Sequence, residues 1–180
     1  MRWRRLDVPG TDRCTLVDLS PGWRLEGSAV FADPGGDARL EYVVSADGDW
    51  RTVRGAVHGT IRHGRVALDI ERTQDGHWRV NGQPMPELEG LVDLDLGFTP
   101  ATNLFPLRRL GLGVGEGAEA AAAWLDEERW VIRRLPQRYE RRADDAWWYE
   151  APDSGYAGLL RVNADGFITD YPGLWRAEPR

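Results

Sequence analysis

Residues 93–110 read Asp93-Leu94-Asp95-Leu96-Gly97-Phe98-Thr99-Pro100-Ala101-Thr102-Asn103-Leu104-Phe105-Pro106-Leu107-Arg108-Arg109-Leu110. Acidic and apolar residues alternate at the start, as they do in a β-strand with two different faces. The second half does not alternate, and Pro106 fits the first turn of a helix, so we expect a short helix over residues 103–110. An ordinary core strand does not need this mixture of carboxylates, hydroxyls, an amide and paired arginines. The stretch is therefore the first place to look for a site.

Short alternating segments separated by glycine-containing turns make up much of the remaining chain. The turns are Pro34-Gly35-Gly36, Asp47-Gly48, His63-Gly64, Asp75-Gly76 and Asn81-Gly82. Between them Leu40, Tyr42 and Val44 share one strand face, and residues 65–71 alternate in the same way. Such strands and turns predict an antiparallel meander. We expect a mainly β protein with one curved antiparallel sheet of about nine to eleven strands, few helices and a single domain over residues 1–180.

Residues 119–142 allow two interpretations. Their Ala, Glu, Arg and Leu content favours a long helix, but Pro136 in the middle would cost about 3 kcal/mol there. Trp130, Val131 and Ile132 are consecutive apolar residues, as in a strand that is buried on both faces. We therefore predict strands over residues 120–125 and 129–134.

Composition and charge exclude several classes of function. The net charge of −6 argues against nonspecific nucleic-acid binding, which requires neutralised phosphates. All 23 basic residues are arginine, so neither a Schiff base nor a P-loop lysine is available. The sequence shows no export signal and no apolar run of about 18 residues, so we expect a cytoplasmic protein without a transmembrane segment. The oligomeric state stays open.

Metal and nucleophile chemistry find little support in the sequence. His58, His63 and His77 lie near turns without an evident third zinc ligand. The single Cys14 rules out an intramolecular disulfide, and we expect it to be a small buried side chain. No metal or cofactor is expected.

Asp93 and Asp95 are the best candidates for acid–base chemistry. At positions i and i+2 of a strand they point the same way, roughly 7 Å apart, a separation that suits an inverting glycosidase. They could also help to hold a hard cation or accept hydrogen bonds from sugar hydroxyls. Alternatively, Val92, Leu94 and Leu96 face the core, while the aspartates face water or pair with arginines.

The polar residues that follow also have two interpretations each. Thr99, Thr102 and Asn103 could shape a turn and cap the helix, or bind a hydroxylated ligand such as a sugar. Arg108 and Arg109 could bind a phosphate or carboxylate, or form salt bridges. Because they are adjacent, at most one of the two arginines should contact a ligand.

Aromatic residues are numerous, with nine tryptophans in the chain. On a curved sheet they could line an apolar trough for acyl chains or rings, or build an ordinary thick core. The set is Trp50, Trp78, Trp124, Trp130, Tyr139, Trp147, Trp148 and Tyr149.

Several segments together resemble a bacterial family of proposed glycolipid-binding proteins. Members carry a run close to DLGFTPATNLLPIRRL, which residues 95–110 resemble closely. The other matching segments are Trp50-Arg51-Thr52-Val53-Arg54, Trp78-Arg79-Val80-Asn81-Gly82, Ala122-Ala123-Trp124-Leu125, Gln137-Arg138-Tyr139, Trp148-Tyr149-Glu150, Gly166-Phe167-Ile168 and Tyr171-Pro172-Gly173-Leu174-Trp175. Their order and spacing over nearly the whole chain make the resemblance specific.

The resemblance implies a fold similar to the bacterial lipoprotein carriers of the LolA type. That fold is an incomplete antiparallel barrel around one or two short helices, with an apolar cavity. Residues 103–110 would then form a helix inside the half-barrel. Leu91 stands where many members have a cysteine, and the absence of an export signal argues against a periplasmic carrier.

Three hypotheses follow, in order of preference. The first is a non-enzymatic protein that binds a glycolipid or other amphiphilic molecule. Its ligand-binding residues would be Trp50, Arg54, Asp93, Asp95, Thr99, Asn103, Arg108, Arg109, Trp124 and Tyr139. The second is an enzyme that acts on a hydroxylated or amphiphilic substrate through Asp93 and Asp95. The third is a scaffold without a ligand.

Overall fold

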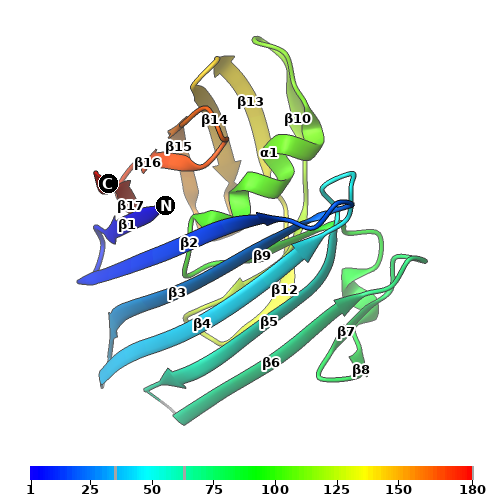
Figure 1. Ribbon diagram of the computed structural model, residues 1–180, viewed down its shortest axis with the longest axis vertical. Helices are drawn as coiled ribbons and strands as arrows, with labels where there is room; N and C mark the ends of the chain where they lie inside the picture. The colour runs from blue at the N-terminus through cyan, green and yellow to red at the C-terminus, as the bar shows by residue number, and fades with distance from the viewer. Residues whose placement is uncertain (35, 63, 180) are drawn as a thin grey trace.

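The computed structural model describes residues 1–34, 36–62 and 64–179, which form seventeen strands. Fourteen of them make one strongly curved antiparallel sheet that does not close into a barrel (Figure 1). In spatial order the strands are β10 (Gly117–Glu119), β13 (Arg138–Ala143), β14 (Ala146–Ala151), β15 (Tyr156–Val162), β16 (Ile168–Tyr171), β17 (Trp175–Ala177), β1 (Arg2–Arg5), β2 (Gly10–Asp18), β3 (Trp23–Asp33), β4 (Gly36–Ala46), β5 (Thr52–Ile61), β6 (Gly64–Arg72), β7 (Trp78–Val80) and β8 (Gln83–Pro84). The expected curved antiparallel sheet is confirmed.

The first and last strands of the described chain meet in the middle of this sheet. β1 pairs with β17 on one side and with β2 on the other, in the register Trp3↔Ala177 and Trp3↔Asp12. Trp3 is fully buried, and its indole Nε1 donates to the Ile168 carbonyl at 2.7 Å. The two halves of the sheet are therefore joined at β1.

A second sheet of three strands packs against the inside of the large one. It contains β9 (Asp93–Leu96), β11 (Ala122–Asp126) and β12 (Val131–Leu135), with β11 parallel to β9 and antiparallel to β12. A methyl group of Leu94 fills the space above Gly55, because a Cβ at residue 55 would lie 2.3 Å from it. The Thr52 hydroxyl accepts the Leu94 N–H at 3.0 Å, which fixes β9 to the start of β5.

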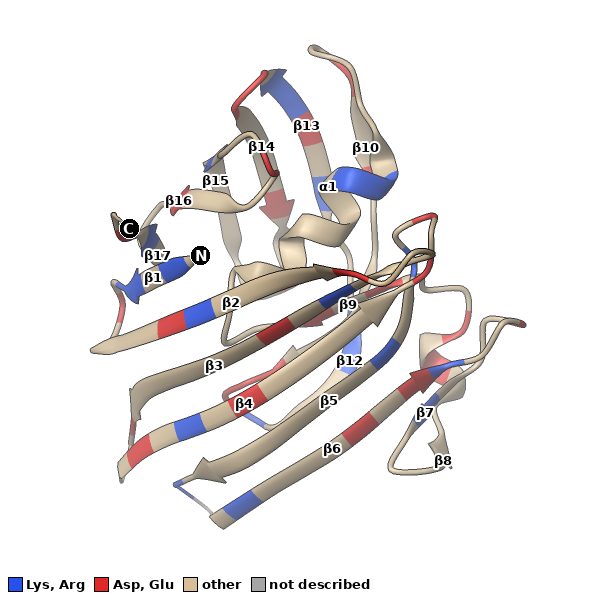
Figure 2. Ribbon diagram, in the orientation of Figure 1, with Lys and Arg blue, Asp and Glu red and all other residues tan. Residues whose placement is uncertain are grey.

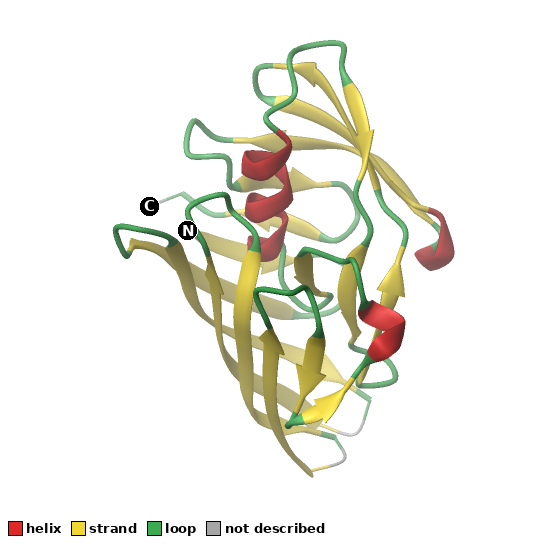
Figure 3. Ribbon diagram, turned by 90° about the vertical axis from the view of Figure 1, so that its right-hand side faces the viewer, coloured by secondary structure: helices red, strands yellow, loops and turns green. Residues whose placement is uncertain are grey.

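The predicted helix lies within the curve of the strands, as Figures 1 and 3 show. It consists of the 3₁₀ turn η2 (Ala101–Asn103) and α1 (Leu104–Leu110), and it ends at Gly111 with a left-handed φ of 57°. Leu104, Phe105, Pro106 and Leu107 are buried, which ties the helix to the core. The remaining 3₁₀ turns are η1 (Pro86–Leu88) and η3 (Pro152–Ser154). In the described parts of the chain no helix has the length and apolarity to span a membrane.

The alternation in the first half of the chain is confirmed, but the strand count was too low. Leu40, Tyr42 and Val44 are all buried, as predicted. The extra strands, such as β7, β8 and β10, have only two or three residues, which is too short for an alternating pattern. Two of the predicted turns include residues 35 and 63, which lie outside the described residues.

The prediction that residues 130–132 are buried on both strand faces is wrong. Trp130 lies in a turn with φ of 56°, and β12 begins at Val131, whose exposed fraction is 46%. In β12, Val131 and Arg134 are exposed whereas Ile132 and Leu135 are buried, so only part of the strand faces the core. The strand itself was correctly predicted.

Candidate functional site

The residues singled out from the sequence fall into two groups. One group forms a buried polar network between α1 and the small sheet. The other lines a cleft between β2, the C-terminal end of α1 and the β15–β16 turn. Thr99 belongs to a separate buried network with Asp12, and Arg54 and Trp124 lie elsewhere.

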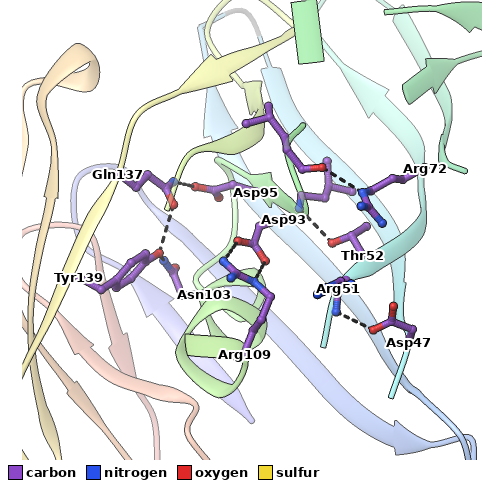
Figure 4. Close-up of polar contacts among 12 residues, drawn as sticks. Asp47, Arg51, Thr52, Arg72, Asp93, Asp95, Asn103, Arg109, Gln137 and Tyr139 are labelled. Carbon is purple, nitrogen blue, oxygen red and sulfur yellow. Dashed lines mark hydrogen bonds and ion pairs between the residues drawn. The ribbon is translucent and has the colours of Figure 1, made fainter. Parts of the chain in front are cut away.

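Asp93 and Arg109 form an ion pair at the centre of the buried group. The Arg109 guanidinium donates through Nε and Nη2 to the two carboxylate oxygens of Asp93, at 3.1 and 2.5 Å (Figure 4). The Asp93 side chain is 2% exposed, and burial raises its pKa although Arg109 opposes the shift. This pair connects α1 to β9, so the salt-bridge interpretation of Arg109 is confirmed.

A chain of hydrogen bonds continues from Asp95 to the start of α1. Gln137 Nε2 donates to Asp95 at 2.6 Å, the Tyr139 hydroxyl donates to Gln137 Oε1 at 3.3 Å, and Asn103 Nδ2 donates to the Tyr139 oxygen at 3.0 Å (Figure 4). Thr102 also contacts Asp95, at 3.4 Å. Burial raises the pKa of Asp95 to about 6. The network joins β9, η2 and β13.

The two aspartates are therefore poorly placed for acid–base work. Asp93 is buried and pairs with Arg109, as the second interpretation allowed. Asp95 is half-buried against Thr102 and Gln137. Asp93 is occupied by Arg109, and Asp95 by an amide and a hydroxyl. Neither lines the cleft described below.

A second buried network was not found from the sequence. Asp12 on β2 is 2% exposed; its carboxylate accepts hydrogen bonds from the hydroxyls of Tyr42, 3.1 Å away, and Thr99. Burial raises the pKa of Asp12 to about 7. Asp12 shares a strand face with Cys14, which is buried as expected, and that shared face was the missed signal.

The Tyr42 ring reaches Asp12 because residue 27 has no side chain. A Cβ at Gly27 would lie 2.2 Å from Tyr42 Cζ, so the ring occupies that space on β3.

Gly27→Ala should therefore lower the free energy of unfolding by about 1–3 kcal/mol, as overpacking in a core does. Urea denaturation measures the change. Gly48→Ala is the matched control, because the nearest atom to its added methyl group lies 4.0 Å away. Equal effects of the two substitutions would contradict the proposed packing.

The cleft has a volume of about 510 Å³ and a wall of aromatic, aliphatic and polar residues. It is lined by Met1, Cys14, Thr15, Leu16, Trp23, Trp50, Arg108, Asp165 and Phe167. Trp23 and Trp50 are half-buried and stack, with ring centroids 4.5 Å apart and ring planes 9° from parallel. Trp23 follows the turn before β3, and Trp50 lies in the turn before β5. The two turns together therefore form one aromatic wall.

Trp50 is held in an uncommon backbone conformation. Its φ is 64°, in the left-handed region that bulky residues rarely adopt. The Asp47 carboxylate accepts the backbone N–H groups of Asp49 and Arg51 at 3.0 and 2.9 Å, and the Asp47 carbonyl accepts that of Trp50. The loop therefore fixes the ring at the cleft, a position at which such strain commonly accompanies function.

Arg108 stands at the mouth of the cleft. Its Nη2 donates to the Asp165 carbonyl at 2.7 Å, and its Cζ lies 5.6 Å from the centre of the Trp50 ring. Figure 2 shows the arginine pair as the blue segment of α1. Thus the two adjacent arginines point to different places, Arg109 toward Asp93 and Arg108 toward the cleft.

The remaining predicted residues lie elsewhere. Arg54 is exposed on the outer face of the large sheet, where it pairs with Asp69 at 3.0 Å. Trp124 lies on the small sheet, with the Arg133 guanidinium 4.6 Å from its ring centre. Sequence reasoning missed Trp23, although it follows a Pro-Gly turn much as Trp50 follows an Asp-Gly turn.

The protein is therefore a mainly β protein in which an open antiparallel sheet curves around a short helix, with a cleft containing two stacked tryptophans beside that helix. The chain belongs to the family described as "Putative glycolipid-binding", which matches residues 1–177. It is similar to a DUF1089 family protein from Pseudomonas aeruginosa, with 28% identity over 93% of this chain and 92% of that chain, and a TM-score of 0.82. No curated protein matches the chain. The family resemblance seen in the sequence is confirmed, whereas the likeness to LolA-type carriers stays a prediction.

Proposed function

We propose that the protein binds an amphiphilic molecule with a ring-shaped, hydroxylated headgroup in the cleft beside α1. The observation that carries this proposal is the stacked pair of Trp23 and Trp50 on the cleft wall. Aromatic faces bind the apolar faces of sugar rings while leaving the hydroxyl groups free for hydrogen bonds. The name of the family supports the same ligand class.

The remaining lining of the cleft suits such a ligand. Leu16 and Phe167 offer apolar surface for the hydrocarbon part. On β2, Cys14 directs its backbone N–H and C=O toward Met1, with N···O distances of 3.0 and 2.6 Å. Strand alternation directs the same groups of Leu16 to the cleft side, where they can bind hydroxyl groups. The volume of about 510 Å³ lies within the range of about 300–1,000 Å³ common for small-molecule sites.

The buried networks have a supporting role in this proposal. Asp93, Asp95, Asn103, Arg109 and Tyr139 are satisfied by one another and by Gln137, so they hold α1 in place. Arg108 projects from α1, and its position therefore depends on that network. The ligand contacts are assigned to the cleft residues and not to the predicted aspartates.

Trp50→Ala should weaken binding of octyl β-D-glucoside about tenfold, because it removes one of the two stacked rings from the cleft wall. A tenfold change corresponds to about 1.4 kcal/mol. Titration followed by the indole N–H resonances in ¹H–¹⁵N spectra measures the affinity. Trp124→Ala is the control, since it removes a half-buried tryptophan outside the cleft. A wild-type protein that binds no alkyl glycoside, or equal losses in both variants, would refute the proposed site.

A further inference from the structure

Arg108 is the one charged side chain that the cleft wall receives from α1, and it forms no ion pair with a carboxylate of the described residues. Among the described residues no carboxylate oxygen lies within 4.0 Å of its guanidinium nitrogens. By contrast, Arg109 pairs with Asp93 and Arg141 with Asp144, at 2.5 and 3.2 Å. The chain has 29 acidic residues against 23 arginines, so a shortage of acids does not explain the difference.

The Arg108 guanidinium is also fixed in position. The Asp165 carbonyl holds Nη2 at 2.7 Å, and the Trp50 ring lies 5.6 Å from Cζ. Its Nε passes over Gly166, where a Cβ would lie 3.2 Å away. The side chain is therefore oriented before a ligand arrives, with Nη1 left for another acceptor. A positioned arginine binds planar or tetrahedral oxyanions through charge-assisted hydrogen bonds.

We propose that the headgroup of the ligand carries an anion, a carboxylate, sulfate or phosphate, and that Arg108 binds it while the headgroup ring packs against the wall formed by Trp23 and Trp50. This inference rests on the proposed function and deepens it, because it selects acidic amphiphiles over neutral ones. A carboxylate, a sulfate and a phosphate have in common an oxyanion, which would lie about one sugar ring away from the aromatic wall.

A substitution at Asp165 gives a second way to test whether the cleft binds an anion. Its carbonyl holds Arg108, while its exposed carboxylate belongs to the rim of the cleft. A bound anion would be repelled by that carboxylate. Asp165→Asn keeps the backbone carbonyl and removes the repulsion, so it should raise the affinity for an anion several-fold.

The test compares two probes that differ only at C6 of the sugar, octyl β-D-glucuronide and octyl β-D-glucoside. At low salt the glucuronide should bind about tenfold more tightly, and the preference should fall as salt rises. Arg108→Gln should weaken glucuronide binding about tenfold more than glucoside binding. Arg79→Gln is the matched control, because Arg79 lies on β7 and its guanidinium also donates to a backbone carbonyl, that of Gly82 at 3.4 Å. Thermal unfolding checks that each variant folds.

Each outcome decides between the two proposals. If the glucoside binds and the glucuronide binds no better, the anion site is refuted and the sugar site stands. If neither binds, the proposed function fails and this inference fails with it. Equal losses from Arg108→Gln and Arg79→Gln would assign the preference to net charge and overturn the site. Inorganic phosphate that binds as tightly as the glucuronide would assign Arg108 to a free anion and overturn the headgroup assignment.

Discussion

Arg109→Ala should lower the free energy of unfolding by about 3–5 kcal/mol, because it leaves the Asp93 carboxylate buried without its cation. The Asp93 side chain on β9 is 2% exposed, and Arg109 is the cation that pairs with it from α1. Urea denaturation monitored by tryptophan fluorescence measures the change. The loss should shrink as the pH is lowered, because burial without a cation raises the pKa of the Asp93 carboxyl and favours its neutral form.

Two further variants separate the charge from the packing. Asp93→Asn should cost less than Arg109→Ala, because the Arg109 side chain is 19% exposed and can reach water. The double variant Asp93→Leu with Arg109→Met removes both charges and keeps similar volumes, so it should recover most of the lost stability. A double variant as unstable as Arg109→Ala would contradict this account of the pair.

Asp12→Asn should make the protein more stable above pH 7, by no more than about 4 kcal/mol. The pKa of Asp12 is raised from 3.8 to about 7 because the carboxylate is buried; the hydrogen bonds from Thr99 and Tyr42 and the charge of the N-terminal amine oppose this shift only in part. Between those values the folded chain keeps a proton that the unfolded chain releases. Wild-type stability therefore falls as pH rises from about 4 to about 7, and the contribution stays lost above pH 7. An asparagine avoids the buried charge, and the rotatable hydroxyls of Tyr42 and Thr99 can accept from its amide.

The difference between the wild type and Asp12→Asn isolates this group from others that titrate. It should be near zero at pH 4 and reach its maximum by pH 8 in urea denaturation curves. Asp95→Asn should also reduce the fall in stability with rising pH, but by less than Asp12→Asn does, because the pKa of Asp95 is raised only to about 6. A difference that does not change with pH would show that Asp12 stays charged throughout.

The sequence predicted local features of the fold well because they depend on neighbours in the chain. Alternation identified the buried face of β4, and Pro106 together with the loss of alternation identified α1. No local sequence pattern predicted that β9, a strand of the small sheet, lies against the inner side of the large sheet. Its contacts come from Thr52 and from α1, and no spacing along the chain encodes them.

The site was harder to predict for the same reason. Asp95 finds its partner 42 residues away at Gln137, and Trp23 meets Trp50 across two separate turns. The candidate list contained most of the right residue types, but it could not separate Arg108 from Arg109. Only the direction of each side chain on α1 assigns one to the ion pair and the other to the cleft.

The pairing of β1 with β17 also has a consequence for how the chain folds. Residues 2–5 complete their pairing only with residues 175–177, a separation that spans nearly the whole sequence. Contacts of such long range slow folding, because the chain must lose much of its conformational freedom before they form. During synthesis the buried indole of Trp3 has no Ile168 carbonyl to bind until the C-terminal hairpins emerge from the ribosome. In the newly made chain the apolar surface around β1 therefore stays uncovered until synthesis is nearly complete. Chaperones that shield such surfaces should bind the chain during that interval.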